Sequence, residues 1–91
     1  MNMRMNVGEV RHAKIEVFST KKNVEFNIDR ASYELIRKDT GKSEAEGTCG
    51  VEGHLIDVVI QPKFSGFYIL KIIYSILNEK IIEHIEINVK E

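Results

Sequence analysis

The sequence predicts one small all-β domain made of two stacked sheets, and three observations lead to this prediction. Apolar and polar residues alternate along most of the chain, which is the pattern of strands buried on one face. Turn-forming residues interrupt the alternation at short intervals and leave about seven short strands, the spacing expected of a sandwich or small barrel. A chain of 91 residues has room for one domain, so residues 1–91 are expected to form a single unit.

The first half of the chain contains three of these predicted strands. Alternation begins at residues 13–17, and the polar residues 19–22 are expected to reverse the chain. A second strand is predicted over residues 24–28 and a third over residues 31–35. A hairpin turn with glycine at positive φ is expected at residues 39–42. The apolar positions of the three strands are Ala13, Ile15, Val17, Val24, Phe26, Ile28, Ala31, Tyr33 and Leu35.

Strands separated by turns are also predicted in the second half of the chain. Residues 43–49 are polar and flanked by glycine, as in an edge strand, and residues 50–53 predict another turn. A strand with inward-facing isoleucine and valine then ends at Pro62, and a long apolar strand is predicted over residues 67–76. A turn at residues 77–80 leads into the last strand. The inward positions of these strands are Ile56, Val58, Ile60, Tyr68, Leu70, Ile72, Tyr74, Ile76, Ile81, Ile85, Ile87 and Val89.

A helix is the alternative for residues 67–88. This segment contains eight isoleucines, and β-branched side chains lose rotamer freedom in a helix but fit a pleated sheet well. Asn78 also lies in the middle of the segment, where a hairpin turn is plausible. The strand interpretation is therefore favoured.

Composition excludes several classes of protein. The 13 basic and 14 acidic residues nearly balance, so no overall field attracts nucleic acid or an anionic membrane. Cys49 is the only cysteine, which excludes an internal disulfide and a cysteine-rich zinc site. Residues 1–6 lack the apolar core of a signal peptide, and the apolar run 67–77 is too short to span a membrane. We expect a protein that is made in the cytoplasm and does not enter a membrane.

One motif narrows the fold. The segment Ser65-Gly66-Phe67-Tyr68-Ile69-Leu70 follows Pro62 and resembles the corner before strand F of immunoglobulin-like domains. The resemblance implies that Gly66 lets the chain turn, and that Tyr68 is buried with its hydroxyl bonded to upstream backbone. Leu70 stands where antibody domains have a cysteine, and tryptophan is absent, so the resemblance is to the broader immunoglobulin-like or fibronectin-like class. The predicted fold is an immunoglobulin-like sandwich of about seven antiparallel strands. The alternative is that Gly-x-Tyr merely starts a strand.

A second resemblance extends over most of the chain. Short accessory domains of phage and prophage particles are similar in five pieces, and together these imply a structural module of a virion or mobile element. The pieces are Val7-Gly8-Glu9, the strand from Ala31 to Leu35, the hairpin from Gly47 to His54, the segment from Pro62 to Tyr68, and the final Ile-x-Ile-x-Val strand.

Catalytic, cofactor and metal sites are not expected. Gly41-Lys42-Ser43 is similar to the end of a phosphate-binding loop, but position 36 is isoleucine instead of the required glycine and no helix is predicted to follow. A metal site would need His12, Cys49, His54 and His84, of which only Cys49 and His54 are close in sequence. Cys49 and His54 as nucleophile and base would also need an orienting group and an oxyanion donor. Glu44 and Glu46 are interpreted as solubilising residues on a polar edge.

The predicted strand 67–76 is apolar on both faces and indicates a contact surface. Its outward residues include Ile69 and Ile73, and the neighbouring strands are expected to add Ile36 and Ile82. An exposed apolar strip of this kind usually marks an interface. The alternative is that a loop or residues 1–6 fold over the strip.

These observations predict a non-enzymatic structural or protein-interaction module whose partner is another protein or a second copy of the chain. The second resemblance implies that this module is an accessory component of a phage or prophage particle. The alternatives are a module that binds carbohydrate or a cell surface, and an accessory domain of a larger complex. Carbohydrate binding is disfavoured because the chain lacks tryptophan and most of its few aromatic residues occupy predicted inward positions.

Overall fold

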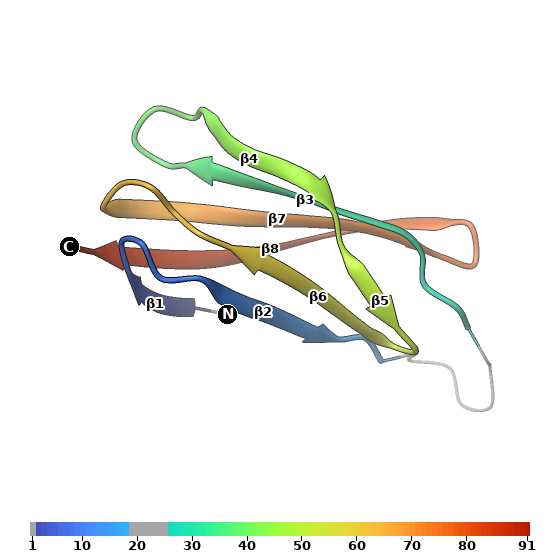
Figure 1. Ribbon diagram of the computed structural model, residues 1–91. Coiled ribbons are helices and arrows are strands. Elements are labelled where there is room, and N and C mark those ends of the chain that lie inside the picture. Colours follow the sequence, from blue (N-terminus) through green and yellow to red (C-terminus); the bar gives the residue numbers. More distant parts are fainter. Residues whose placement is uncertain (1, 19–25) are drawn as a thin grey trace.

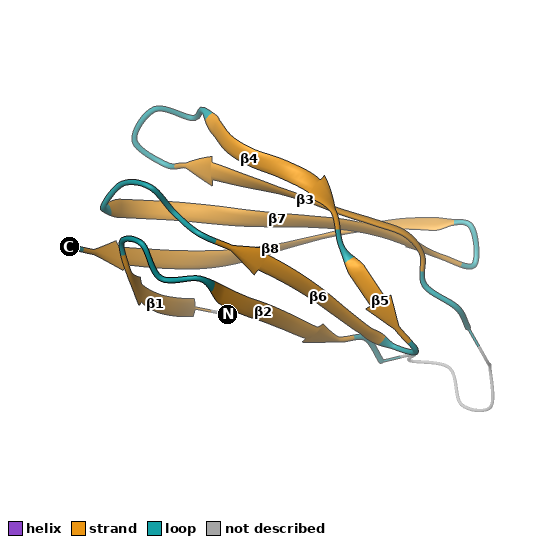
Figure 2. Ribbon diagram, in the orientation of Figure 1, coloured by secondary structure: helices purple, strands orange, loops and turns teal. Residues whose placement is uncertain are grey.

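The computed structural model describes residues 2–18 and 26–91, and these residues form eight strands and no helix (Figures 1 and 2). The all-β prediction is therefore confirmed, and the helix alternative for residues 67–88 is wrong. The strands are β1 (Asn2–Asn6), β2 (Arg11–Glu16), β3 (Asp29–Arg37), β4 (Ser43–Thr48), β5 (Gly50–Glu52), β6 (Leu55–Ile60), β7 (Gly66–Ile76) and β8 (Glu79–Lys90). None of the described residues forms a helix that could cross a membrane.

The strands form two sheets. The larger sheet has the order β1-β8-β7-β3-β4, and the smaller sheet has the order β2-β6-β5. All neighbouring strands are antiparallel except β1 and β8, which run parallel. The prediction of about seven antiparallel strands needs correction in both respects, because the described residues contain eight strands and the larger sheet is mixed.

The core lies between the two sheets. Ile56, Val58 and Ile60 of β6 are at most 2% exposed, and Tyr68, Leu70 and Ile72 of β7 are at most 1% exposed. Every second residue of each strand contributes to the core because successive side chains of a strand point to opposite faces. The predicted inward sets of β6 and β7 are thereby confirmed, apart from the partly buried Ile76 at the end of β7. The long β7–β8 hairpin makes the molecule elongated, with extents of 46 × 20 × 19 Å.

The chain passes from one sheet to the other on both sides of the sandwich (Figure 1). On one side β1 belongs to the larger sheet and β2 to the smaller, and residues 7–10 connect them. On the other side only Cys49 separates β4 of the larger sheet from β5 of the smaller. The predicted turn at residues 50–53 is therefore wrong in position: β5 occupies most of it, and the turn lies at Gly53 and His54.

Two further elements differ from the prediction. Residues 2–6 form β1, which the alternation did not reveal because its core contact depends mainly on one side chain, Met5, at 4% exposure. The strand predicted over 24–28 is absent from its described part, residues 26–28. Phe26 is nevertheless buried and Ile28 packs against the core, so their apolar character reflects burial in a loop. Val24 and the predicted reversal at 19–22 lie outside the described residues.

Candidate interaction surface and the corner that supports it

Tyr68 anchors one end of the larger sheet. Its side chain is 1% exposed, and its hydroxyl lies 3.1 Å from the carbonyl oxygen of Phe64, four residues upstream. Gly66 precedes it with a φ of 130°, a conformation that side-chain-bearing residues rarely adopt. The buried Tyr68 bonded to upstream backbone is as the resemblance implied, whereas the chain bends at residues 63–65 and Gly66 is the first residue of β7.

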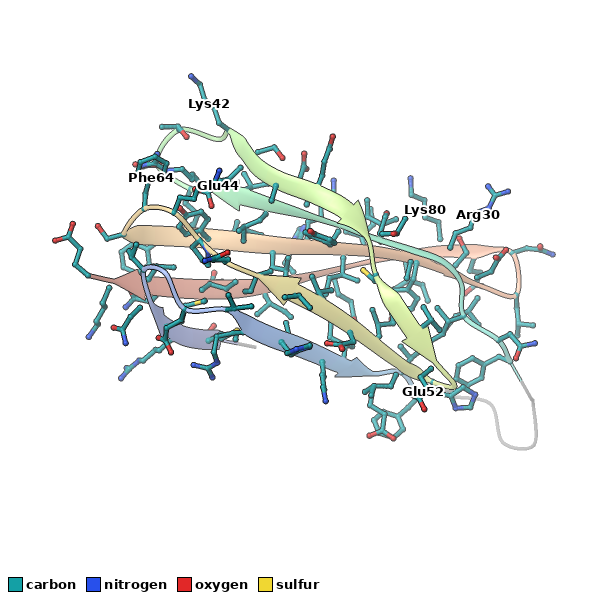
Figure 3. The ribbon with its side chains drawn as sticks, in the orientation of Figure 1. Arg30, Lys42, Glu44, Glu52, Phe64 and Lys80 are labelled. Carbon is teal, nitrogen blue, oxygen red and sulfur yellow. The ribbon has the colours of Figure 1, made fainter. Side chains whose placement is uncertain are left out.

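The Tyr68 hydroxyl has a second, closer partner in Glu44. It donates to Glu44 Oε1 at 2.7 Å, while Glu44 Oε2 accepts the backbone N–H of Lys63 at 3.1 Å. Figure 3 shows Glu44 beside Phe64 at this end of the sandwich. The carboxylate thus ties the edge strand β4 to the loop between β6 and β7.

A bulge in β4 turns Glu44 toward Tyr68. Leu35 pairs with Ala45 and Ile36 pairs with Ser43, so Glu44 is the extra residue between the two pairs. Bulges re-aim side chains in this way. The expectation that Glu44 is a solubilising edge residue is therefore incomplete, because its carboxylate is part of a hydrogen-bonded corner.

Burial and this corner change the acidity of the Tyr68 hydroxyl. Burial raises the pKa of Tyr68 to about 12, and the hydrogen bond from the hydroxyl to Glu44 acts in the same direction. Burial also raises the pKa of Tyr74, with a smaller contribution from Glu83. Both groups are therefore neutral well above physiological pH.

The four isoleucines of the predicted strip lie on one face of the larger sheet, the face turned away from the smaller sheet and hereafter called the outer face. Ile36 pairs with Ile69 across β3 and β7, and Ile73 pairs with Ile82 across β7 and β8. Directly opposed residues of neighbouring strands share a face. Ile82 is 48% exposed, and Ile36, Ile69 and Ile73 are half-buried.

A row of three charged residues and one histidine, hereafter the charged row, separates the two isoleucine pairs. Glu46, Glu34, Lys71 and His84 lie side by side on β4, β3, β7 and β8, because the strand register pairs each with the next. Ile69 and Ile73 lie about 13 Å apart along β7, two residues to either side of Lys71. The outer face is consequently two apolar pairs flanking a charged row, and not the continuous strip that the strand pattern suggested.

An ion pair borders the outer face near Ile69. Lys38 Nζ lies 3.9 Å from Glu86 Oε1, and the pair spans β7, since Lys38 follows β3 and Glu86 lies on β8. Both side chains are solvent-exposed, so the stabilisation from this pair is small. Phe67, on β7 next to Lys38, is 63% exposed.

The N-terminal residues do not cover the isoleucines. Asn2–Asn6 forms β1 in the plane of the sheet, hydrogen-bonded to the outer edge of β8. The alternative that this segment folds over the apolar residues is therefore wrong for residues 2–6.

The residues considered for catalysis or metal binding have other partners. His54 stacks on Phe26, with ring centroids 4.0 Å apart, and its Nε2 donates to the Phe26 carbonyl at 3.1 Å. His12 Nδ1 lies 3.0 Å from an Asp57 carboxylate oxygen, and His84 belongs to the charged row of the outer face. Across residues 2–18 and 26–91, no three His, Cys, Asp or Glu side chains are placed to hold a metal ion.

The setting of Cys49 keeps its thiol protonated at neutral pH, because its pKa is raised. It lies at the crossing between β4 and β5, is partly buried and packs against the core. Burial raises its pKa to about 11, and the negative charge of Asp57 adds to the effect. The thiol is protonated at neutral pH, whereas a nucleophilic cysteine must form a thiolate.

Gly41-Lys42-Ser43 forms the end of a hairpin turn. Gly41 has a φ of 71°, and the segment leads directly into β4. A phosphate-binding loop leads into a helix, so the turn interpretation of this segment is confirmed.

Sequence reasoning missed the charged row and the Glu44 bridge for the same reason. Both depend on which residues of distant strands are directly opposed, and alternation within one strand does not determine that register.

No family of known proteins matches this chain, and comparisons with curated proteins and with solved structures likewise find no match.

Proposed function

We propose that the chain is a non-enzymatic, immunoglobulin-like interaction module that contacts another protein through the outer face of its larger sheet. The order of the strands supports an immunoglobulin-like fold. Strands β2, β6 and β5 occupy the places of B, E and D, and β8, β7 and β3 occupy those of G, F and C. The Tyr68 hydroxyl bonded to the Phe64 carbonyl also matches the tyrosine corner of that fold.

The observation that carries the functional proposal is the outer face of β7. A strand covered on one side normally presents polar residues to water on its other side. Strand β7 instead presents Phe67, Ile69 and Ile73, and β8 adds Ile82. Apolar residues gathered on one face of a small domain favour a contact with another protein.

The class of partner that we propose is a structural protein of a virus particle or mobile element. Its support is the resemblance of five segments of the chain to phage accessory domains. Carbohydrate binding has less support, since Tyr68 and Tyr74 are buried in the core and do not offer their rings for stacking on a sugar.

Site-specific photo-crosslinking in the organism that produces the chain tests this proposal. A photoreactive residue at Ile82 probes the outer face, and one at Val59 on β6 is the matched control, because the two side chains are 48% and 49% exposed. We expect a discrete protein adduct from position 82 and little or none from position 59. Absence of an adduct from position 82, or equal adducts from both positions, would contradict the proposal.

A further inference from the structure

We infer that the outer face binds the same face of a second copy of this chain, with a two-fold axis that runs along the strands between β3 and β7. This inference rests on the proposed function, because it names the partner of the surface proposed there. It comes from the order of charges in the row that crosses the outer face.

The charges of this row change sign at its centre. Glu46 and Glu34 lie on β4 and β3, and Lys71 and His84 lie on β7 and β8. Acidic residues thus occupy one half of the row, and a lysine and a histidine occupy the other half. The line of sign change runs between β3 and β7.

A symmetric contact between two identical faces requires a two-fold axis in the plane of the contact. An axis perpendicular to the strands and through this row would place each residue opposite its own copy, so that Lys71 faces Lys71 and Glu34 faces Glu34. An axis parallel to the strands and between β3 and β7 exchanges the two halves. Glu34 then faces Lys71 of the second copy, and Glu46 faces its His84.

The same axis brings the Ile36–Ile69 pair of one copy onto that of the other. It places Ile36 opposite Ile69 of the second copy, whereas Ile73 lies opposite Ser32 and Ile82 lies opposite Thr48 of the second copy. At the end of the face, Phe67 lies opposite Lys38 of the second copy, because the N–H of Lys38, the residue after β3, donates to the carbonyl of Phe67 on β7. Stacking of an ammonium group on an exposed aromatic ring is favourable.

The area of the face sets the expected strength of the contact. Four strands spaced ~4.8 Å apart and about ten residues long give a face of ~600 Å² per copy. Two copies would bury ~1,200 Å² in total, which is the lower limit for specific protein interfaces. We therefore expect a reversible dimer whose population depends on protein concentration.

Analytical ultracentrifugation of charge-reversal variants tests the axis. Glu34→Lys and Lys71→Glu each place like charges opposite each other twice per dimer, so we expect each variant to dimerise at least about tenfold more weakly than the unmodified chain. An equimolar mixture of the two variants restores both opposite-charge pairs and should form a heterodimer. Glu52→Lys, an exposed position on β5 of the smaller sheet, is the control and should leave dimerisation unchanged.

Three results would overturn the inference. They are an unmodified chain that stays monomeric up to about millimolar concentration, a dimer that neither reversal weakens, and weakened variants whose mixture does not associate. Heterodimer formation in the mixture also shows that both variants are folded. Photo-crosslinking at Ile82 still distinguishes the two proposals, because an adduct with a different protein supports the proposed function even when self-association fails.

Discussion

At the scale of single residues, a few polar groups connect one edge of the larger sheet to a neighbouring loop. Tyr68, Glu44 and Lys63 form one hydrogen-bonded corner that joins the edge strand β4 to the β6–β7 loop. Arg37 lies over the Phe64 ring of the same loop, with its guanidinium carbon 4.7 Å from the ring centroid. The corner holds the end of β7 whose other face carries Phe67 and Ile69, so its integrity positions part of the outer face.

Removal of the Tyr68 hydroxyl should destabilise the domain. Tyr68→Phe keeps the buried ring but leaves Glu44 without its shortest hydrogen bond, and a bond to a charged group typically contributes about 2 kcal/mol. We expect the free energy of unfolding in urea to fall by roughly that amount. Glu44→Gln should cost less, about 1 kcal/mol, because the amide oxygen still accepts one bond.

Glu46→Gln is the matched control for Glu44, since both glutamates lie on β4 and Glu46 faces solvent. It should change stability by less than about 0.5 kcal/mol. The double variant Tyr68→Phe, Glu44→Gln should be less destabilised than the sum of the single variants, because both substitutions act on the same hydrogen-bonded corner. Strict additivity would show that Glu44 and Tyr68 act independently.

The raised pKa of Tyr68 predicts a loss of stability in alkaline solution. The folded protein holds this proton more tightly, with a pKa of about 12 against an ordinary value of 10.0. Its contribution is therefore complete below about pH 10 and is lost as pH rises toward about pH 12. The free energy of unfolding should fall by up to about 1.4 kcal/mol per pH unit from this group.

Tyr68→Phe provides the comparison for this pH dependence. The variant retains Tyr74 and Cys49, whose pKa values are also raised, and it should lose less stability than the unmodified chain across the same window. Urea unfolding at several alkaline pH values measures both slopes. Equal slopes would show that Tyr68 is not responsible.

At the scale of elements, the β7–β8 hairpin is the largest unit of the sheet. It pairs without interruption from Gly66 opposite Val89 to Ile76 opposite Glu79. Its turn consists of Leu77 and Asn78, with φ values of 48° and 68°. Such a two-residue turn fits the right-handed twist of the strands, but it favours Asn-Gly over Leu-Asn.

Replacement of the turn by its preferred residues should stabilise the domain. Leucine at positive φ is strained, so Leu77→Asn combined with Asn78→Gly should raise the free energy of unfolding by about 1 kcal/mol. Thermal unfolding measures the gain. Leu77→Ala is the control because it removes the exposed side chain and keeps the backbone strain, and an equal gain from that variant would contradict this explanation.

Elements with regular alternation were predictable from sequence, and elements that depend on distant contacts were not. The inward residues of β6 and β7 follow from period-two patterns alone. Strand β1 was missed because it is an edge strand with one deeply buried residue, Met5. Phe26 and Ile28 led to the prediction of a strand that is absent from residues 26–28, since a buried loop residue has the same apolar character as a strand residue.

The candidate surface was predictable only in part. The four isoleucines could be assigned to one face from the expected pairing of three strands. The charged row between them depends on the relative register of β4, β3, β7 and β8, which local patterns leave open. The burial of Tyr68 and the bond of its hydroxyl to upstream backbone were predictable from the sequence, but its Glu44 partner depends on a bulge in another strand.

At the scale of the whole molecule, residues 2–6 lie in the plane of the larger sheet as strand β1 and leave the outer face of that sheet uncovered. That face combines half-buried isoleucines with a row whose charge changes sign at its centre. A binding surface that is complementary to itself needs both features: apolar residues supply affinity, and opposed charges determine orientation.

Amide chemical shifts of the isotope-labelled chain, followed by NMR over a dilution series, test this claim most directly. We expect concentration-dependent shifts at Glu34, Lys71 and Ile73 of the outer face, and constant shifts at His12 and Val59 of the smaller sheet. Shifts that are independent of concentration, or that change mainly on the smaller sheet, would contradict the account.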